Sequence, residues 1–236
     1  MNEGKSNEEI WREFTELFEK DDFFKNFRSH IVRNNLGYGD NQFCILWDKI
    51  ISSFQNEFSF LEIGVYKGQI LCLAALIAKK YNLNSKIYGV SPLYNLSDKT
   101  TRYDRDDYKA KIVSLHNHFG LEFCIDKQII QGISTDDKIK NQVLELPPFD
   151  IIYVDGGHEY ETVASDIKLA KKICKNNGYI VTDDASFFKD FSNFSLLPSF
   201  VGHKEVSLAV ADFLENDPHY IEEYCVAHVR AFKKIK

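Results

Sequence analysis

Acidic side chains follow two predicted buried strands that lie far apart in the chain. Asp155 comes directly after the apolar run 149–154, and Asp183 and Asp184 follow the run 178–182. If these strands are neighbours in a parallel sheet, their carboxyl ends meet at one edge and the three carboxylates converge. Converging carboxylates raise their own pKa values unless a cation offsets the repulsion, and an all-oxygen ligand set suits magnesium, manganese or calcium. The alternative is that the aspartate pair only caps a helix or turn.

One histidine stands close to the first of these acids. His158 follows Asp155 by three residues, in a loop that contains Gly156 and Gly157. An imidazole titrates near neutral pH and suits a general base, although a lone loop histidine is often simply solvated. The spacing to Asp155 favours the catalytic interpretation. No comparable partner is predicted for the other histidines, which are His30, His116, His118, His203, His219 and His228. Of these, the two at 116 and 118 are expected at the surface of a helix.

The segment 58–78 combines a short apolar run, a glycine-bearing turn and a long apolar run. A strand, a turn and a helix in this order form the nucleotide-binding corner of a doubly wound α/β sheet. The spacing is E-x-G-x-x-x-G, from Glu62 through Gly64 to Gly68. Tyr66 stands where a dinucleotide fingerprint would have its middle glycine. The turn is therefore predicted to take an adenosine cofactor smaller than a dinucleotide.

Apolar runs and amphipathic segments alternate along the chain and define the elements that would position these residues. Strands are predicted at 60–63, 86–92, 128–131, 149–154 and 178–182, with a terminal pair at 220–226 and 229–235. Helices are predicted at 41–54, 70–78, 106–119, 136–144, 160–175 and 203–214. This alternation predicts an α/β fold with a doubly wound, mostly parallel Rossmann-like sheet and an antiparallel C-terminal strand.

Two aromatic segments accompany the predicted core, residues 56–236. An N-terminal helical extension, residues 1–55, is predicted to begin with an amphipathic helix near Ser6 or Asn7. The apolar face of that helix carries Trp11, Phe14, Leu17 and Phe18. It either packs on the edge of the domain or covers an acceptor pocket as a lid. A polar loop at 92–105 and a phenylalanine-rich loop at 187–200 are also expected, and the second would help to close the acceptor side.

Composition narrows the class of protein. The chain has 236 residues, 44% of them hydrophobic, which is enough for one domain over residues 1–236 with a sizeable core. A formal net charge of −6 disfavours a nucleic-acid binder with a basic surface. The five cysteines stand singly, the N-terminal segment has no apolar signal core, and no apolar run reaches membrane-spanning length. We expect a soluble cytoplasmic protein with no membrane partner, and homo-oligomer formation is left open.

Taken together, these residues resemble those of class I S-adenosylmethionine-dependent methyltransferases. More closely, the chain is similar to the metal-dependent small-molecule O-methyltransferases of the macrocin O-methyltransferase type. The resemblance runs from about residue 58 to residue 235 and is carried by FLEIGVYKG, FDIIYVDGGHEYETVASDI and GYIVTDDAS. The first of these motifs is shared by many methyltransferases. The second and third are more restrictive because they join two distant segments.

The resemblance implies a role for each candidate position. The implied cofactor-binding residues are Glu62, Gly64, Tyr66, Gly68, Ser91, Ser134 and Asp155, with Ser134 near the adenine. The implied magnesium ligands are Asp155, Asp183 and Asp184, and the implied catalytic residues are Asp155 and the general base His158. Ser91 departs from the family pattern, because an acidic residue usually holds the ribose hydroxyls there. A serine hydroxyl can bond one ribose oxygen, but the bidentate hydrogen bonding of a carboxylate to both ribose hydroxyls is lost.

The function implied by the resemblance is S-adenosylmethionine-dependent, divalent-metal-assisted O-methylation of a small hydroxylated acceptor. A sugar or a glycosylated metabolite is the favoured acceptor. Three other classes stay open at this point. They are a non-catalytic adenosylmethionine-binding protein, an NAD-type oxidoreductase, which Tyr66 and Ser91 disfavour, and a metal-dependent hydrolase, which would leave the glycine turn without a purpose.

Overall fold

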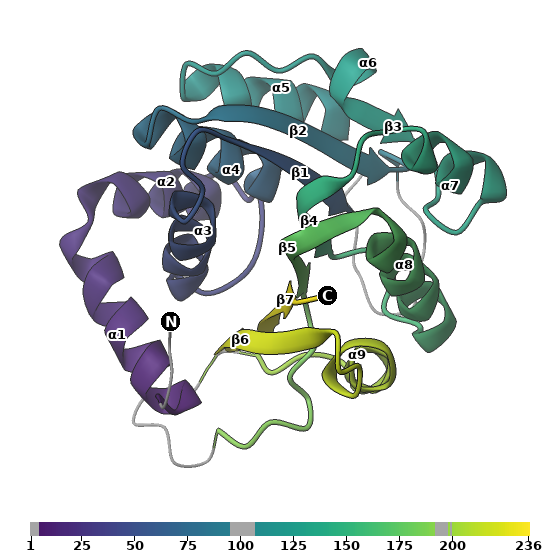
Figure 1. The fold of residues 1–236 in the computed structure, drawn as a ribbon. Coiled ribbons are helices and arrows are strands. Elements are labelled where there is room, and N and C mark those ends of the chain that lie inside the picture. The colour runs from purple at the N-terminus through teal and green to yellow at the C-terminus, as the bar shows by residue number, and fades with distance from the viewer. Residues whose placement is uncertain (1–4, 95–106, 192–197, 199) are drawn as a thin grey trace.

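The strands form one sheet in the order β3-β2-β1-β4-β5-β7-β6 (Figure 1). The computed structural model describes residues 5–94, 107–191, 198 and 200–236. The strands are β1 Glu57–Ile63, β2 Asn84–Ser91, β3 Ile129–Gln131, β4 Phe149–Val154, β5 Cys174–Thr182, β6 Tyr220–Val226 and β7 Val229–Lys234. The first five are parallel to one another, and β7 runs antiparallel between β5 and β6. The predicted fold class is confirmed.

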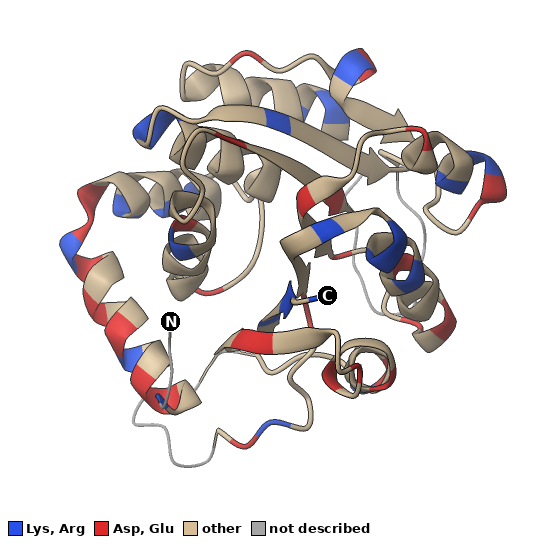
Figure 2. Ribbon diagram, viewed as in Figure 1, with Lys and Arg blue, Asp and Glu red and all other residues tan. Residues whose placement is uncertain are grey.

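Helices cover both faces of this sheet (Figure 1). They are α1 Asn7–Lys20, α2 Asp22–Arg33, α3 Gln42–Ser52, α4 Gln69–Lys80, α5 Tyr108–His118, α6 Ile125–Gln128, α7 Asp137–Leu144, α8 Tyr160–Ile173 and α9 Lys204–Val210, which continues as a π-helical turn η1 Ala211–Glu215. Lys, Arg, Asp and Glu are interspersed along α1, α7 and α8 (Figure 2). Within the described ranges, no helix combines the length and the apolar character that crossing a membrane requires.

The central strands are buried on both sides because successive side chains point to opposite faces. Phe60 and Ile151 join one core with α1 to α5, and Leu61 and Ile152 join the other with α7, α8 and α9. This explains why β1 and β4 appear in the sequence as continuous apolar runs rather than as alternating ones. Both cores hold the strand ends that carry the candidate site residues.

The order of strands places the carboxyl ends of β1, β4 and β5 side by side. Ile63 pairs with Val154, and Val154 pairs with Thr182, so the three strands end level. Strand β5 begins earlier than predicted, since Cys174 already pairs with Phe149 before an irregularity in the register. The residues that follow the three strands therefore start from one edge of the sheet, as the sequence predicts.

The N-terminal extension contains more structure than its sequence indicates. Helix α1 begins after a capping box of Ser6 and Glu9, and its aromatic face is buried against α3 and β6. A second helix, α2, was not predicted; the Asp21 carboxylate starts it by accepting from the backbone amides of Phe23 and Phe24. The predicted terminal hairpin is present, and it turns without glycine because Ala227 adopts a left-handed φ of 50°.

Some predicted segments fall wholly or partly beyond the described residues. Most of the predicted loop 92–105, the first residue of the predicted helix 106–119, and Phe194 of the phenylalanine-rich loop are among these. The described part of that loop exposes Phe187 and Phe188 and buries Phe191.

Candidate active site

Three acids meet where β4 and β5 end. The backbone amide of Asp155 donates to the carbonyl of Ile63 at 2.8 Å, and that of Asp183 donates to the carbonyl of Val154 at 3.0 Å. These bonds continue the parallel pairing one residue beyond the strands. The carboxyl groups of Asp155 and Asp183 are in contact, and Asp184 follows directly. The convergence expected from the sequence is therefore present.

The electrostatics of the three carboxyls differ. Burial raises the pKa of Asp155 well above its usual range, and the charges of Asp183, Asp184 and Glu62 raise it further. Burial also raises the pKa of Asp183. Burial acts on Asp184 in the same direction, but the hydrogen bond with His158 and the nearby imidazoles lower the pKa of Asp184 below its ordinary value. The protein alone thus keeps Asp184 charged and favours a proton on Asp155.

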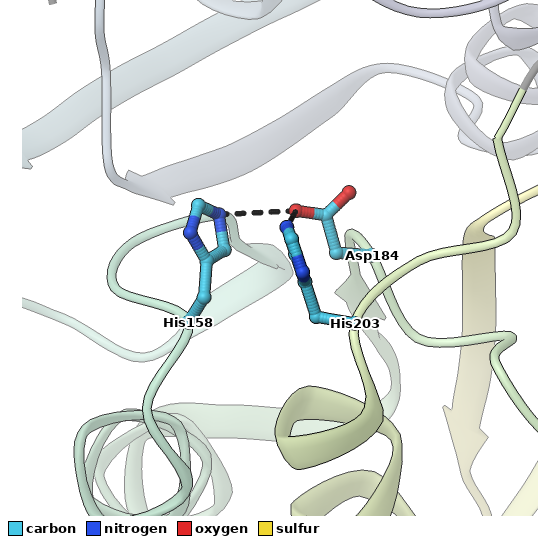
Figure 3. Close-up of side chains that lie close together, drawn as sticks. All are labelled: His158, Asp184 and His203. Atoms are coloured by element: carbon cyan, nitrogen blue, oxygen red, sulfur yellow. Dashed lines mark ion pairs between the residues drawn. The ribbon is translucent and has the colours of Figure 1, made fainter. Parts of the chain in front are cut away.

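Three histidines surround the Asp183–Asp184 pair. Nε2 of His158 lies 3.0 Å from Oδ2 of Asp184, and Nε2 of His203 lies 3.7 Å from the same oxygen (Figure 3). Nε2 of His228 lies 3.3 Å from Oδ1 of Asp183. The prediction that only His158 has an acidic partner here was wrong. No spacing signal could find the other two, because His203 arrives at the start of α9 and His228 at the tip of the last hairpin.

The expectation of a surface position is confirmed for His118, which is exposed, and is wrong for His116. His116 is fully buried, its Nδ1 lies 2.8 Å from the carbonyl of Ile112, and its ring stacks on Phe123. Burial lowers the pKa of His116. His118 stacks on His30 with ring centroids 3.7 Å apart. Both histidines therefore pack against other rings, and neither lies near the acids.

The ligand atoms at the acids form two sets, each spanning no more than 4.8 Å. Within the described part of the chain, the first set is His158, Asp184 and His203, and the second is Asp183, Asp184 and His228. Asp155 belongs to neither set, although its carboxyl contacts Asp183. The donor atoms available for a cation are thus both carboxylate oxygens and imidazole nitrogens. This set fits a divalent metal ion.

The glycine turn after β1 abuts the acidic centre. Gly64 has φ +101°, and a Cβ at this position would lie 1.8 Å from the carbonyl oxygen of Asp155. Only glycine allows the two backbones to approach so closely. Glu62 is 2% exposed, burial raises its pKa well above the usual range, and its Oε2 has no hydrogen-bond partner among the described residues. A buried, unsatisfied carboxyl oxygen beside a bare backbone fits a ligand with a polar, hydrogen-donating end.

The remaining predicted cofactor residues lie in this turn or at the ends of β2 and β3. Tyr66 has a left-handed φ of 45°, and its ring stacks on Tyr38 with centroids 5.8 Å apart. Gly68 caps the start of α4. Ser91 ends β2, is 6% exposed, and accepts a hydrogen bond from the amide of Leu93 at 3.4 Å. Ser134 follows β3.

A segment of the N-terminal extension covers the turn, which the sequence did not indicate. The carbonyl of Asn35 accepts from Nζ of Lys67 at 3.0 Å, and the carbonyl of Tyr38 accepts from Nε2 of Gln69 at 3.1 Å. Residues 35–39 therefore pack directly against the candidate cofactor site.

The sheet with one reversed strand near its edge, the glycine turn after β1 and the acids at the neighbouring strand ends form the arrangement of a Rossmann-like methyltransferase, and the family of the chain agrees with it. The chain belongs to the methyltransferase domain family Methyltransf_24, whose profile matches residues 61–185, more than half of the sequence. The matched region contains the turn and all three acids.

Individual proteins show similarity at lower identity. An uncharacterized protein of Acanthamoeba polyphaga mimivirus is 28% identical over 157 residues, covering 66% of this chain and 64% of the relative. The match thus spans less than two thirds of that curated relative. A Staphylococcus aureus protein assigned as a caffeoyl-CoA O-methyltransferase has a similar structure, with a TM-score of 0.63, 14% identity and coverage of 95% of this chain and 98% of that one.

Two further solved structures share the fold. CalS11, a TDP-rhamnose 3'-O-methyltransferase of calicheamicin biosynthesis, has a TM-score of 0.56 at 12% identity. The aligned region covers 95% of this chain and 93% of CalS11. MycE of the mycinamycin pathway, solved with magnesium and S-adenosylhomocysteine, has a TM-score of 0.55 at 18% identity, with coverage of 90% of this chain and 55% of MycE. At these identities the likeness shows the fold.

Proposed function

We propose that this chain is an S-adenosylmethionine-dependent, divalent-metal-assisted O-methyltransferase whose acceptor is a small hydroxylated molecule, with a sugar or glycosylated metabolite favoured. The observation that carries the proposal is the contact between the backbones of Gly64 and Asp155. It joins the cofactor turn and the acidic centre into one site. A methyl donor on the turn would therefore lie beside the acids and His158.

The cofactor would be held by the turn and its surroundings. Glu62, with its unsatisfied buried oxygen, would accept from the amino end of S-adenosylmethionine. Ser91 would bond one ribose hydroxyl, and Ser134 would lie near the adenine. Gly64, Tyr66 and Gly68 would shape the turn. The bound cofactor supplies a methyl group that the sulfonium already activates, so the protein must mainly align the acceptor and remove its proton.

The proton would go to His158. Its Nε2 is held by the Asp184 carboxylate at 3.0 Å, which fixes the ring and stabilises the imidazolium form. The side chain is partly exposed, so an acceptor hydroxyl can reach it. Asp155, Asp183 and Asp184 would hold the cation. When bound, a divalent cation holds the acceptor hydroxyl and lowers its pKa.

Two of the similar structures support the choice of a sugar acceptor and of a divalent metal ion. CalS11 acts on TDP-rhamnose and MycE was solved with magnesium, and both share the fold. Four expectations stay predictions. They are the macrocin-type assignment, the single domain over residues 1–236, the cytoplasmic location and the formation of a homo-oligomer.

Calorimetry with S-adenosylhomocysteine tests the cofactor part. The chain should bind it, and Glu62→Leu should weaken binding at least tenfold. The acceptor class is then tested by incubating the protein with S-adenosylmethionine that carries a labelled methyl group and a panel of nucleotide-linked sugars. Mass spectrometry shows which sugar, if any, gains the labelled methyl group. If the folded protein shows no binding of S-adenosylhomocysteine, the whole proposal fails. If it binds but transfers no methyl group to any sugar, the sugar class is wrong.

A further inference from the structure

Oδ2 of Asp184 lies between two imidazoles that come from different parts of the fold. His158 belongs to the loop between β4 and α8, and His203 is the residue before α9 (Figure 3). Their Nε2 atoms lie 3.0 Å and 3.7 Å from this oxygen, and their ring centroids are 4.5 Å apart. All three side chains are partly buried.

The backbone fixes His203 relative to Asp184. The amide of His203 donates to the carbonyl of Asp184 at 2.8 Å. Gly202 makes this approach feasible, because it has φ +104° and a Cβ there would lie 2.2 Å from the same carbonyl oxygen. The position of His203 beside the acid is thus imposed by the chain and does not depend on a flexible side chain alone.

The two segments that carry the histidines are also tied to each other. The backbone amide of Tyr160, two residues after His158, donates to Oε2 of Glu205, two residues after His203, at 3.1 Å. The starts of α8 and α9 are therefore held together at the centre. Such a preorganised arrangement favours binding because little order is lost when an ion enters.

The distances separate the roles of the two imidazoles. His158 is within hydrogen-bond distance of Asp184. The 3.7 Å between His203 and Asp184 is too long for a hydrogen bond. It is close to the spacing of about 3–3.5 Å expected for two ligand atoms that each lie ~2.1 Å from one ion. The 3.0 Å between His158 and Asp184 would also suit two ligands of one ion, but that imidazole is already within hydrogen-bond distance of the carboxylate and orients it. His203, beyond hydrogen-bond distance of Asp184, is therefore the imidazole placed as a ligand.

We propose that the centre binds a divalent transition metal in preference to magnesium, with Nε2 of His203 as a nitrogen ligand beside the Asp184 carboxylate. Imidazole nitrogen is a good ligand for divalent iron, cobalt, nickel and zinc. Magnesium, in contrast, prefers oxygen ligands at every position. The inference rests on the metal-assisted part of the proposed function and names the metal class of that site. His158 keeps its place as the base, hydrogen-bonded to the same carboxylate.

The test is a titration of metal-free, full-length protein with cobalt(II), followed by visible absorption, in competition with magnesium. Cobalt should bind at least a hundredfold more tightly than magnesium and give d–d bands. His203→Ala should lose at least tenfold in cobalt affinity, since even indirect partners of metal ligands contribute 10- to 100-fold. Magnesium affinity should change little in this variant.

His219→Ala is the matched control, because His219 also lies beside a carboxylate, 2.9 Å from Asp217, on another part of the surface. It should bind cobalt as the parent does. Wild-type protein gives a second measurement if His203→Ala does not fold: cobalt should protect His203, and leave His219 unprotected, from carbethoxylation by diethyl pyrocarbonate.

Equal affinity of the wild type for cobalt and magnesium would overturn the proposal. So would full cobalt affinity of folded His203→Ala, or failure of cobalt to protect His203. These readouts need neither methyl donor nor acceptor. A protein that binds cobalt through His203 but does not bind S-adenosylhomocysteine would refute the proposed function and leave the metal assignment standing.

Discussion

The backbone amide of Asp183 donates to the carbonyl of Val154 at 3.0 Å, one residue past the end of both strands. This bond aligns Asp183 with Asp155, which follows Val154 directly. Two acids 28 positions apart in the sequence thereby share one edge of the sheet. The register of β4 and β5 accounts for their meeting.

Replacing either proposed catalytic residue should separate chemistry from cofactor binding. His158→Ala and Asp155→Ala should each lower methyl transfer by about 10²- to 10⁴-fold, the usual contribution of a positioned base. Binding of S-adenosylhomocysteine, measured by calorimetry, should stay within a few-fold of the parent. His219→Ala serves as the control. Full activity of both variants would eliminate the proposed base and its acidic neighbour.

Removing divalent cations should stop methyl transfer without releasing the cofactor. Excess chelator should abolish turnover, and S-adenosylhomocysteine should still bind, because the glycine turn uses backbone and Glu62 rather than the cation. Adding back a divalent metal should restore the rate. Undiminished turnover in chelator would show that the acids serve another purpose.

The close approach at Gly64 predicts a severe effect of a single methyl group. Gly64→Ala combines a left-handed φ with a Cβ only 1.8 Å from the Asp155 carbonyl oxygen. Gly120→Ala is a matched control, since Gly120 has φ +64° and its Cβ would meet nothing nearer than Nζ of Lys79 at 3.8 Å. The control should lose about 1–2 kcal/mol of unfolding free energy from backbone strain alone.

Denaturant unfolding measures both variants. We expect Gly64→Ala to lose clearly more stability than Gly120→Ala, together with its affinity for S-adenosylhomocysteine. Equal losses in the two variants would mean that the Gly64 and Asp155 backbones can separate at little cost.

Stability should depend on pH through Asp166, which lies in α8 and is 1% exposed. Burial raises the pKa of Asp166 to about 7, and the Ser134 hydroxyl and Lys140 oppose this shift only in part. The unfolded chain releases this proton near pH 4. Between about pH 4 and 7 the folded state therefore holds more protons, and the free energy of unfolding falls as pH rises, by at most about 4 kcal/mol.

Asp166→Asn should remove the contribution of this group, so its free energy of unfolding should fall less steeply with pH than that of the parent, and it should be more stable than the parent at pH 8. Asp126→Asn, at an exposed aspartate of α6, should follow the parent. The measurement is urea unfolding at several pH values. Parallel pH curves for the parent and Asp166→Asn would contradict the assignment.

The sequence predicted the parts of the site that local pattern determines. The apolar runs before Asp155 and Asp183 identify buried parallel strands, and the sheet order then brings their ends together. It could not predict His203 and His228, because each reaches the acids through tertiary packing, by the start of a helix and by a hairpin tip. His116 was misplaced for a related reason: its burial depends on the ring of Phe123 and on α5 packing. Helix α2 was not predicted although Phe24, Phe27 and Ile31 form an apolar stripe, because a single residue, the capping Asp21, separates it from α1.

Asp184 adopts φ 54°, a left-handed conformation that glycine tolerates better than any other residue. Exchanging it for glycine would relieve that backbone strain, but it would also remove a carboxylate whose charge the hydrogen bond with His158 and the imidazoles of His203 and His228 stabilise. The strained backbone at position 184 is thus the counterpart of the contacts that its side chain makes, and a glycine there would remove both together.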